Sequence, residues 1–304
     1  MIKFGEFHVT IKIKLRNMNK ILLALMVVVL VASCGQKKKS LNSVTVSILP
    51  QKFIVEQLLG DGVEINVMIP DGNSPATYSP TPEQMKAVSS SSLYLKIGHI
   101  GFEQAWIEKF QSINGDLKVV DTSAGIQLIR GEGHQHGDHY HEGGIDPHIW
   151  TSPKTMLKVM KNTQVALIDK YPEQKDRILE RGKLLESKII ELDESYSKAR
   201  EEMISHKFII FHPAYTYLAR DYSLVQVSIE HMGKEPSAKW LKEIADMVKE
   251  ENIKAIFIQR EFDKRNAEMI ATEAGIPVIQ VNPLAENWDV EMRKTLDLLV
   301  KALS

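Results

Sequence analysis

The chain has 304 residues, of which 43% are hydrophobic and 25% are charged, as in an average soluble globular protein. Its 38 basic and 39 acidic residues give a net charge of −1, and this balance argues against nucleic-acid binding. The single cysteine, Cys34, excludes an internal disulfide.

The first element along the chain is an export signal. Residues 21–32 are uncharged and apolar and follow Lys20. They are too few to span a bilayer, which takes about 20 residues. A basic segment followed by a short apolar one predicts a secretory signal peptide. We expect a leader over residues 1–33, with its true start at Met1 or Met18.

A lipid anchor is expected directly after the leader. The segment Val31-Ala32-Ser33-Cys34 resembles a bacterial lipobox, in which the cysteine becomes the lipidated first residue of the mature protein. Residues 34–43, which include three consecutive lysines, then form a polar tether. The sequence therefore predicts an extracytoplasmic lipoprotein, anchored in the periplasm or at the cell surface.

Residues 44–151 predict an N-terminal α/β lobe. Strands and helices alternate along this segment, and Thr81 can cap a helix that has Pro82 at its first position. This alternation implies a parallel sheet with helices on both faces. Strands are expected at 44–49, 63–69, 93–97 and 117–120, and helices at 51–59, from 82 onward and at 102–110.

Within this lobe, residues 131–144 are rich in glycine and histidine and show no apolar period. Low complexity of this kind predicts a mobile loop. Imidazole is the commonest protein ligand for zinc, so the loop is a candidate auxiliary metal site. Its ligands would be His134, His136, His139 and His141.

Residues 152–205 are helical in character and predict a linker between lobes. Tyr171-Pro172 interrupts the pattern once. The second part, 173–203, would form a helix about 45 Å long. Its apolar residues recur at helical spacing and should face inward: Ile178, Leu185, Ile189, Leu192 and Tyr196. Such a helix is long enough to connect two lobes rigidly.

Residues 206–304 repeat the alternation and predict a C-terminal lobe. The expected strands are 208–211, 225–229, 253–258 and 277–281, and Ser237 can cap a helix that ends near 249. About 265 residues after the leader suit two lobes better than one core. The expected fold is α/β, with two doubly wound lobes joined by one long rigid helix.

Two histidines lie where such folds bind ligands. In open α/β sheets, ligands bind at the carboxyl ends of the strands. His212 directly follows the strand at 208–211, and His148 lies in the turn that enters the linker. One histidine from each side of a cleft can begin a metal site, which closure of the lobes would complete.

Five segments resemble the signatures of the zinc- and manganese-binding lipoproteins of bacterial ABC importers, in the same order. Residues 146–153 (DPHIWTSP) and 211–217 (FHPAYTY) are the most specific, and the others are 72–82, 235–237 and 282–284. The resemblance covers the chain from about Val44 to its end. It implies two α/β lobes, a metal between them, an ABC permease with its ATPase as partner, and a monomer.

The chain departs from this family at two ligand positions. The resemblance implies His148 and His212 as ligands, but Ala76 stands where a histidine is usual and Asn282 where an acidic residue is usual. His99 follows the strand at 93–97 and is the expected replacement for the missing histidine. Candidates for a fourth ligand are water, Asn282, Glu230 and His231. An amide oxygen is a weaker zinc ligand than a carboxylate.

The expected function is capture of Zn²⁺ for an ABC permease, without enzymatic activity. Imidazoles favour Zn²⁺, while the carboxylates that favour Mn²⁺ are scarce in the expected shell. A relative that binds Mn²⁺, another metal or a metal chelate is the alternative. A metal-dependent hydrolase is disfavoured because the chain has no His-Glu-x-x-His and no Gly-x-Ser-x-Gly motif. Cell adhesion is a role often assigned to this family, but the sequence contains no adhesion motif.

Overall fold

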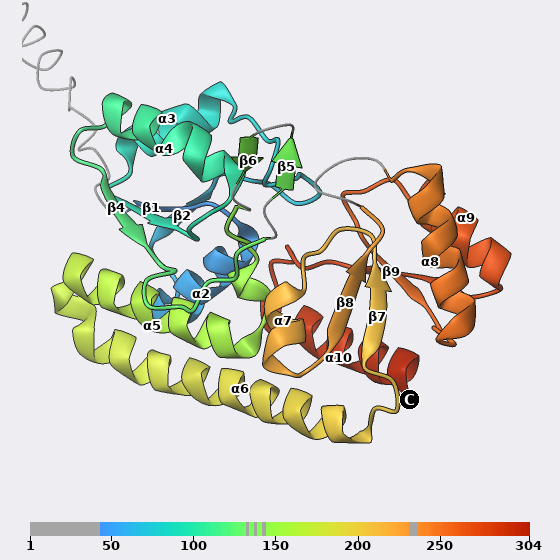
Figure 1. The fold of residues 1–304 in the computed structure, drawn as a ribbon. Coiled ribbons are helices and arrows are strands. Elements are labelled where there is room, and N and C mark those ends of the chain that lie inside the picture. The colour runs from blue at the N-terminus through green and yellow to red at the C-terminus, as the bar shows by residue number, and fades with distance from the viewer. Residues whose placement is uncertain (1–42, 132–133, 137–138, 142–143, 231–235) are drawn as a thin grey trace, which may run out of the picture. The chain divides into compact units, whose positions relative to one another are not determined.

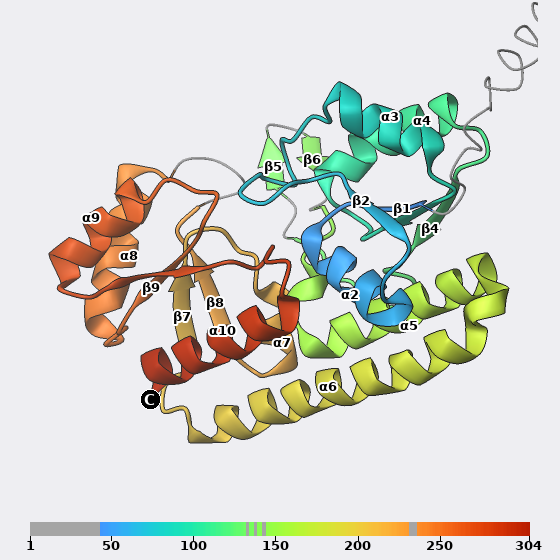
Figure 2. The same cartoon turned by 180° about the vertical axis from the view of Figure 1, so that it is seen from behind.

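The computed structural model describes residues 43–131, 134–136, 139–141, 144–230 and 236–304. The chain divides into two compact units, Met1–Leu41 and Asn42–Ser304, and the second contains every element described below. It holds the two expected α/β lobes and a long helix that runs along both (Figure 1, Figure 2). No helix in the described ranges is long and apolar enough to cross a membrane. The leader and Cys34 lie outside the described residues.

The N-terminal lobe is built on a parallel sheet with the strand order β2-β1-β3-β4. α3 and α4 cover one face of this sheet, while α2 and α5 cover the other (Figure 1). The order reverses between β1 and β3, so the loops after these two strands border the crevice where such sheets bind ligands. The elements are β1 (Ser43–Val46), α2 (Leu49–Leu59), β2 (Glu64–Val67), α3 (Pro82–Ser90), β3 (Leu93–Lys96), α4 (Gly101–Ile113), β4 (Lys118–Asp121) and α5 (Pro153–Lys170).

The residues that begin α2 and α3 are set by local signals, and the start of α2 determines where β1 ends. The strand expected at 44–49 stops at Val46, because α2 begins at Leu49 with Pro50 in its first turn. Thr81 caps α3 as expected: its Oγ1 accepts a hydrogen bond from Gln84 N at 3.3 Å, and Gln84 Oε1 accepts one from Thr81 N at 2.9 Å. Such a reciprocal pair satisfies two backbone donors that the helix leaves free.

The segment at 131–144 is not a loop throughout, which corrects the sequence expectation. β5 (His134–His136) and β6 (His139–His141) form an antiparallel hairpin that opposes His134 to His141 and His136 to His139. Arg130 and Ile145 pair at its base. Backbone pairing of this kind needs no apolar face. The absence of an apolar period was therefore a poor guide here.

The linker has the expected break and the expected long helix. Two short 3₁₀ helices, η1 (Ile149–Thr151) and η2 (Pro172–Gln174), precede α5 and α6. α6 (Lys175–Glu202) has 28 residues, which corresponds to about 42 Å. It contacts α2 and α5 at one end and α10 at the other. The residues predicted to face inward are all buried: Ile178, Leu185, Ile189, Leu192 and Tyr196.

The C-terminal lobe repeats the design with the strand order β10-β9-β7-β8. α8 and α9 cover one face, and α7 and α10 the other (Figure 2). Here the order reverses between β9 and β7. Ser237 caps α8, since its Oγ accepts from Trp240 N at 3.2 Å. The elements are β7 (Lys207–Ile210), α7 (Thr216–Asp221), β8 (Val225–Ser228), α8 (Ala238–Glu250), β9 (Ile256–Gln259), α9 (Arg265–Ala274), β10 (Val278–Val281) and α10 (Trp288–Leu303).

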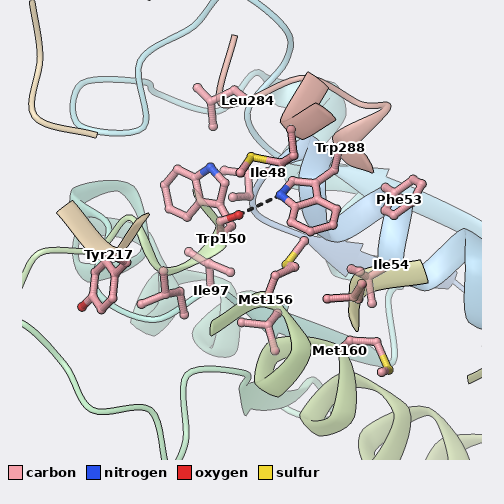
Figure 3. Close-up of a cluster of buried hydrophobic side chains, with 14 of the residues drawn as sticks. Ile48, Phe53, Ile54, Ile97, Trp150, Met156, Met160, Tyr217, Leu284 and Trp288 are labelled. Atoms are coloured by element: carbon pink, nitrogen blue, oxygen red, sulfur yellow. Dashed lines mark hydrogen bonds between the residues drawn. The ribbon is translucent and has the colours of Figure 1, made fainter. Parts of the chain in front are cut away.

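The hydrophobic core continues across the lobe boundary. One cluster of buried side chains runs from β1 and α2 through α5 and α6 to α10 and the inner face of the C-terminal sheet. Two buried tryptophans lie at its centre, and Trp288 Nε1 donates to the carbonyl of Trp150 at 2.7 Å (Figure 3). Trp150 Nε1 in turn donates to the carbonyl of Pro283 at 2.9 Å. A large closure of the lobes would therefore break part of a packed interior.

Candidate metal centre

His148 and His212 converge, as the sequence predicted. Their Nε2 atoms lie 3.3 Å apart, and their ring centroids are 5.1 Å apart at an interplanar angle of 74°. His148 precedes η1, and His212 follows β7. Both rings are partly buried, with 15% and 25% of the side-chain surface exposed. The lobes need no further movement to bring these two nitrogens together.

A carboxylate holds the other nitrogen of each ring. Nδ1 of His148 lies 2.9 Å from Asp146 Oδ1, and Nδ1 of His212 lies 2.7 Å from Glu230 Oε2. Burial alone raises the pKa of Asp146, but its hydrogen bonds, chiefly the one with the His148 ring, outweigh burial and hold that pKa below its ordinary value. A neutral imidazole that donates from Nδ1 to a carboxylate keeps its Nε2 lone pair free for a cation.

At 3.3 Å the two Nε2 atoms are within hydrogen-bond distance, so either one ring donates a proton to the other or both bind a cation that takes the place of that proton. Two imidazole nitrogens bound to one tetrahedral Zn²⁺ at 2.0–2.1 Å are separated by about 3.3 Å. Carboxylate–histidine pairs of this kind orient metal-binding imidazoles and raise their basicity. The pair therefore has the spacing and the carboxylate partners of two zinc ligands.

The backbone and ring of His212 are fixed by the last residue of β9 and by the loop that follows it. Gln259 Oε1 accepts from His212 N at 3.2 Å, and Gln259 Nε2 donates to His212 O at 2.6 Å. The ring of Phe262 stacks on the imidazole with a centroid distance of 5.0 Å. On the other side, Tyr217 Oη donates to the carbonyl of Asp146 at 2.8 Å. The two histidine segments are thus connected through the C-terminal lobe.

Both histidines line a cavity of about 320 Å³ between the lobes, which we call the interlobe cavity. Most of its wall is apolar and comes from loops at the carboxyl ends of the strands. The residues that line it, besides the two histidines, are Ser74, Pro75, Ala76, Thr77, Ile100, Gly101, Pro147, Trp150, Ala214, Glu230, Glu261, Phe262, Pro283 and Leu284. Among the described residues, no three His, Cys, Asp or Glu side chains already form a group that could hold a metal ion.

Ala76 lines this cavity, so the position that lacks a histidine does face the candidate site. Its loop rests on the start of α4, where Phe102 N donates to the carbonyl of Pro75 at 3.0 Å. A β-carbon built on Gly101 would approach Ala76 O to 3.3 Å. The glycine at position 101 therefore allows the loop that carries Ala76 to pack closely against the start of α4.

His99 and Asn282 do not line the interlobe cavity, although both are close to it along the chain. His99 belongs to the loop between β3 and α4, of which Ile100 and Gly101 reach the cavity wall. Its carbonyl accepts from Gln104 Nε2 at 3.1 Å. Asn282 lines a separate pocket of about 260 Å³, and its Oδ1 accepts from Leu284 N at 3.2 Å.

Of the remaining ligand candidates, the structure describes the side chain of Glu230 alone. Glu230 lines the cavity, but its carboxylate is engaged with Nδ1 of His212. His231 lies outside the described residues. The four histidines of the β5–β6 hairpin are described only by their backbone pairing.

Sequence reasoning gave no role to Asp146, Gln259, Glu261 and Phe262. Asp146 stands within a quoted motif, and the other three follow the strand expected at 253–258. Ligands bind at the carboxyl ends of strands, and this rule applies to the strand at 253–258 as well as to the strand before His212. Applied to both strands, the rule would have placed Glu261 at the site.

Comparisons with known proteins find zinc-uptake components among the relatives of this chain. The model of the family described as zinc-uptake complex component A, periplasmic, matches residues 44–302. The high-affinity zinc uptake system protein ZnuA of Bacillus subtilis is 28% identical over 272 residues, which cover 84% of this chain and 85% of that protein. The zinc-binding lipoprotein AdcA of Streptococcus pneumoniae is 26% identical over 306 residues. That match covers 94% of this chain, which spans only 60% of the length of AdcA.

Solved structures share the fold. A crystal structure of ZnuA matches with a TM-score of 0.80 and 34% identity, and covers 86% of this chain and 99% of its own. Lmb of Streptococcus agalactiae, described as a bifunctional protein with adhesin and metal transporting activity, matches with a TM-score of 0.75 and 26% identity over the same shares. Since the family model spans most of the chain, the chain belongs to the family of periplasmic zinc-uptake components.

Proposed function

We propose that the protein captures Zn²⁺ in the interlobe cavity and delivers it to an ABC permease. The observation that supports this function most directly is the pair of Nε2 atoms at 3.3 Å, each on a ring whose Nδ1 is held by a carboxylate. His148 and His212 are the proposed ligands. The relatives ZnuA and AdcA are described by their zinc uptake and zinc binding, and none of the quoted relatives is described as a hydrolase.

Calorimetry on the metal-free protein tests this function. We expect zinc binding with a dissociation constant well below micromolar. His148→Ala and His212→Ala should each weaken it by at least about 100-fold, because each removes a direct ligand and leaves the partner carboxylate unpaired. His206→Ala is the matched control, since His206 precedes β7 and lies away from the cavity. Wild-type affinity in both ligand variants would remove these histidines from the site.

The remaining coordination positions also need ligands. His99, Asn282, Glu230 and His231 are candidates from the sequence, and a water molecule is another. His99 lies one residue from the cavity wall, so a change in its loop would bring it to the ion. A His99→Ala variant that binds zinc like wild type would exclude it. Imidazole ligands favour Zn²⁺ over Mn²⁺, so we propose zinc as the preferred cargo.

The proposed setting is the outer face of a membrane. Lipidation of Cys34 would anchor the tether there, and the His-rich hairpin would serve as an auxiliary metal site. A Cys34→Ser variant should move from the membrane fraction to the soluble fraction of cells. The proposed partners are the permease and its ATPase, and the protein would act as a monomer.

A further inference from the structure

One carboxylate of the interlobe cavity, that of Glu261, holds neither histidine ring. Glu261 lines the cavity with both histidines, two residues beyond the end of β9. Within the described part of the chain, no other side chain forms a hydrogen bond or an ion pair with its carboxylate. Burial raises the pKa of Glu261. A half-buried carboxylate without an ion-pair partner is unfavourable unless a cation joins it.

The other polar groups near the histidines are already engaged. Asp146 and Glu230 each accept from a histidine Nδ1. Asn282 accepts from the backbone in a separate pocket, and Ala76 offers no donor atom. Glu261 is therefore the cavity-lining carboxylate, of those the structure describes, that is free to take a ligand.

The neighbours of Glu261 hold its loop over the site. Arg260 pairs with Asp71 of the N-terminal lobe at 2.5 Å, and Phe262 stacks on the ring of His212. β9 and β7 flank the point where the strand order reverses, so side chains that follow these strands enter the same crevice.

We propose that Glu261 supplies an anionic oxygen ligand to the captured Zn²⁺ and replaces the imidazole that is missing at Ala76. The proposal rests on the proposed function, because it requires an ion between His148 and His212. The carboxylate does not yet form a group of three ligands with them, so it reaches the ion by rotation of its own side chain.

The resulting shell has two imidazoles, one carboxylate and one water. Three protein ligands with an open position are typical of zinc sites that exchange a ligand. A carboxylate is also a harder ligand than imidazole, so this shell accepts Mn²⁺ more readily than a shell of three histidines. Cargo selectivity would then depend on residue 261 as well as on the histidines.

Calorimetry and Co²⁺ absorption spectra of the metal-free full-length protein test the proposal. Glu261→Gln should weaken zinc binding at least about tenfold and shift the visible d–d bands of bound Co²⁺, which report the ligand set. Glu261→His restores a metal ligand at the same position and should recover most of the affinity. Asp263→Asn is the matched control, because Asp263 belongs to the same loop but is exposed and paired with Arg265.

The outcomes separate this proposal from the proposed function. If the wild type binds zinc, and Glu261→Gln changes neither the affinity for zinc nor the Co²⁺ spectrum, only the role of Glu261 is overturned. A wild-type protein that binds no zinc overturns both. Thermal melting of the metal-free variants guards against loss of folding, and an equal loss of affinity in Asp263→Asn would mean that the loop acts structurally.

Discussion

The proposed chemistry depends on which nitrogen of each imidazole carries a proton. Asp146 and Glu230 each hold a histidine by its Nδ1, so the Nε2 atom of each ring is the one left to bind an ion. Without these carboxylates each ring could adopt the other tautomer or turn away. The two acidic residues therefore orient the ligands without touching the ion themselves.

Asp146→Asn and Glu230→Gln should each weaken zinc binding about 10–100-fold, because an amide keeps the shape but removes the charge that fixes the tautomer. Calorimetry with a competing chelator measures the change. Asp169→Asn is the control and should have no effect, because Asp169 is exposed, pairs with Lys118 and does not line the interlobe cavity. Equal affinity in all three variants would contradict the orienting role.

Ala76 offers the reverse experiment, a gain of a ligand. It is exposed and lines the same cavity as the two histidines. Ala76→His should tighten zinc binding by at least about tenfold, equivalent to 1.4 kcal/mol. Ala76→Leu adds bulk without a donor atom and should not tighten it. If the two variants bind equally, position 76 does not reach the ion.

At the scale of elements, loops after the strands carry the site, and helices hold these loops. Glu103 of α4 is buried and binds the loop that follows β3: its carboxylate accepts from Ile97 N at 2.7 Å and from Gly98 N at 2.8 Å. It also accepts from Ser47, which follows β1. One side chain thus joins both loops at the reversal point of the N-terminal sheet.

Burial raises the pKa of Glu103 from 4.5 to about 8, although its hydrogen bonds and Lys96 favour the ionised form. Between these values the folded protein holds a proton that the unfolded chain has lost. The free energy of unfolding should therefore fall as pH rises from about 4.5 to 8, by up to about 1.4 kcal/mol per pH unit. Urea unfolding of the metal-free protein at several pH values measures it.

Glu103→Gln should flatten this dependence, because the amide does not titrate. Glu108→Gln is the control, as Glu108 is exposed on the same helix. An identical pH dependence in both variants would mean that Glu103 is ionised in the folded state throughout.

At the scale of the molecule, the two lobes share one interior. Trp288 of α10 packs against Phe53 of α2 at a centroid distance of 6.2 Å and donates to the carbonyl of Trp150 (Figure 3). The ion pair between Lys52 and Glu286 also crosses from one lobe to the other. These contacts favour a preformed cavity over a freely hinged clamp.

Trp288→Ala should lower the free energy of unfolding by about 3–5 kcal/mol, because it leaves a large cavity at the lobe boundary. Val290→Ala, on the same helix but 62% exposed, should change it by less than about 0.5 kcal/mol. Denaturant unfolding followed by fluorescence and circular dichroism measures both. Two separate transitions in the wild type would show that the lobes unfold independently.

The sequence alone predicted most of the fold, since its signals are local. The caps at Thr81 and Ser237, the break at Tyr171-Pro172 and the inward face of α6 depend on neighbours a few residues away. Strand ends were less accurate, because a helix start such as that of α2 competes for the same residues. The strands at 134–136 and 139–141 were not predicted, because backbone pairing alone produces no pattern of apolar residues in the sequence.

The sequence by itself determined the two α/β lobes, the long helix between them and the two histidines that follow strand and turn at the lobe edges. Only the tertiary structure decided which groups meet in space. It placed Asp146 and Glu230 on the outer nitrogens, Glu261 at the cavity wall and Asn282 in another pocket. The physical reason is range: propensity and periodicity act within a few residues, whereas a coordination shell joins side chains from distant loops at distances of a few ångströms.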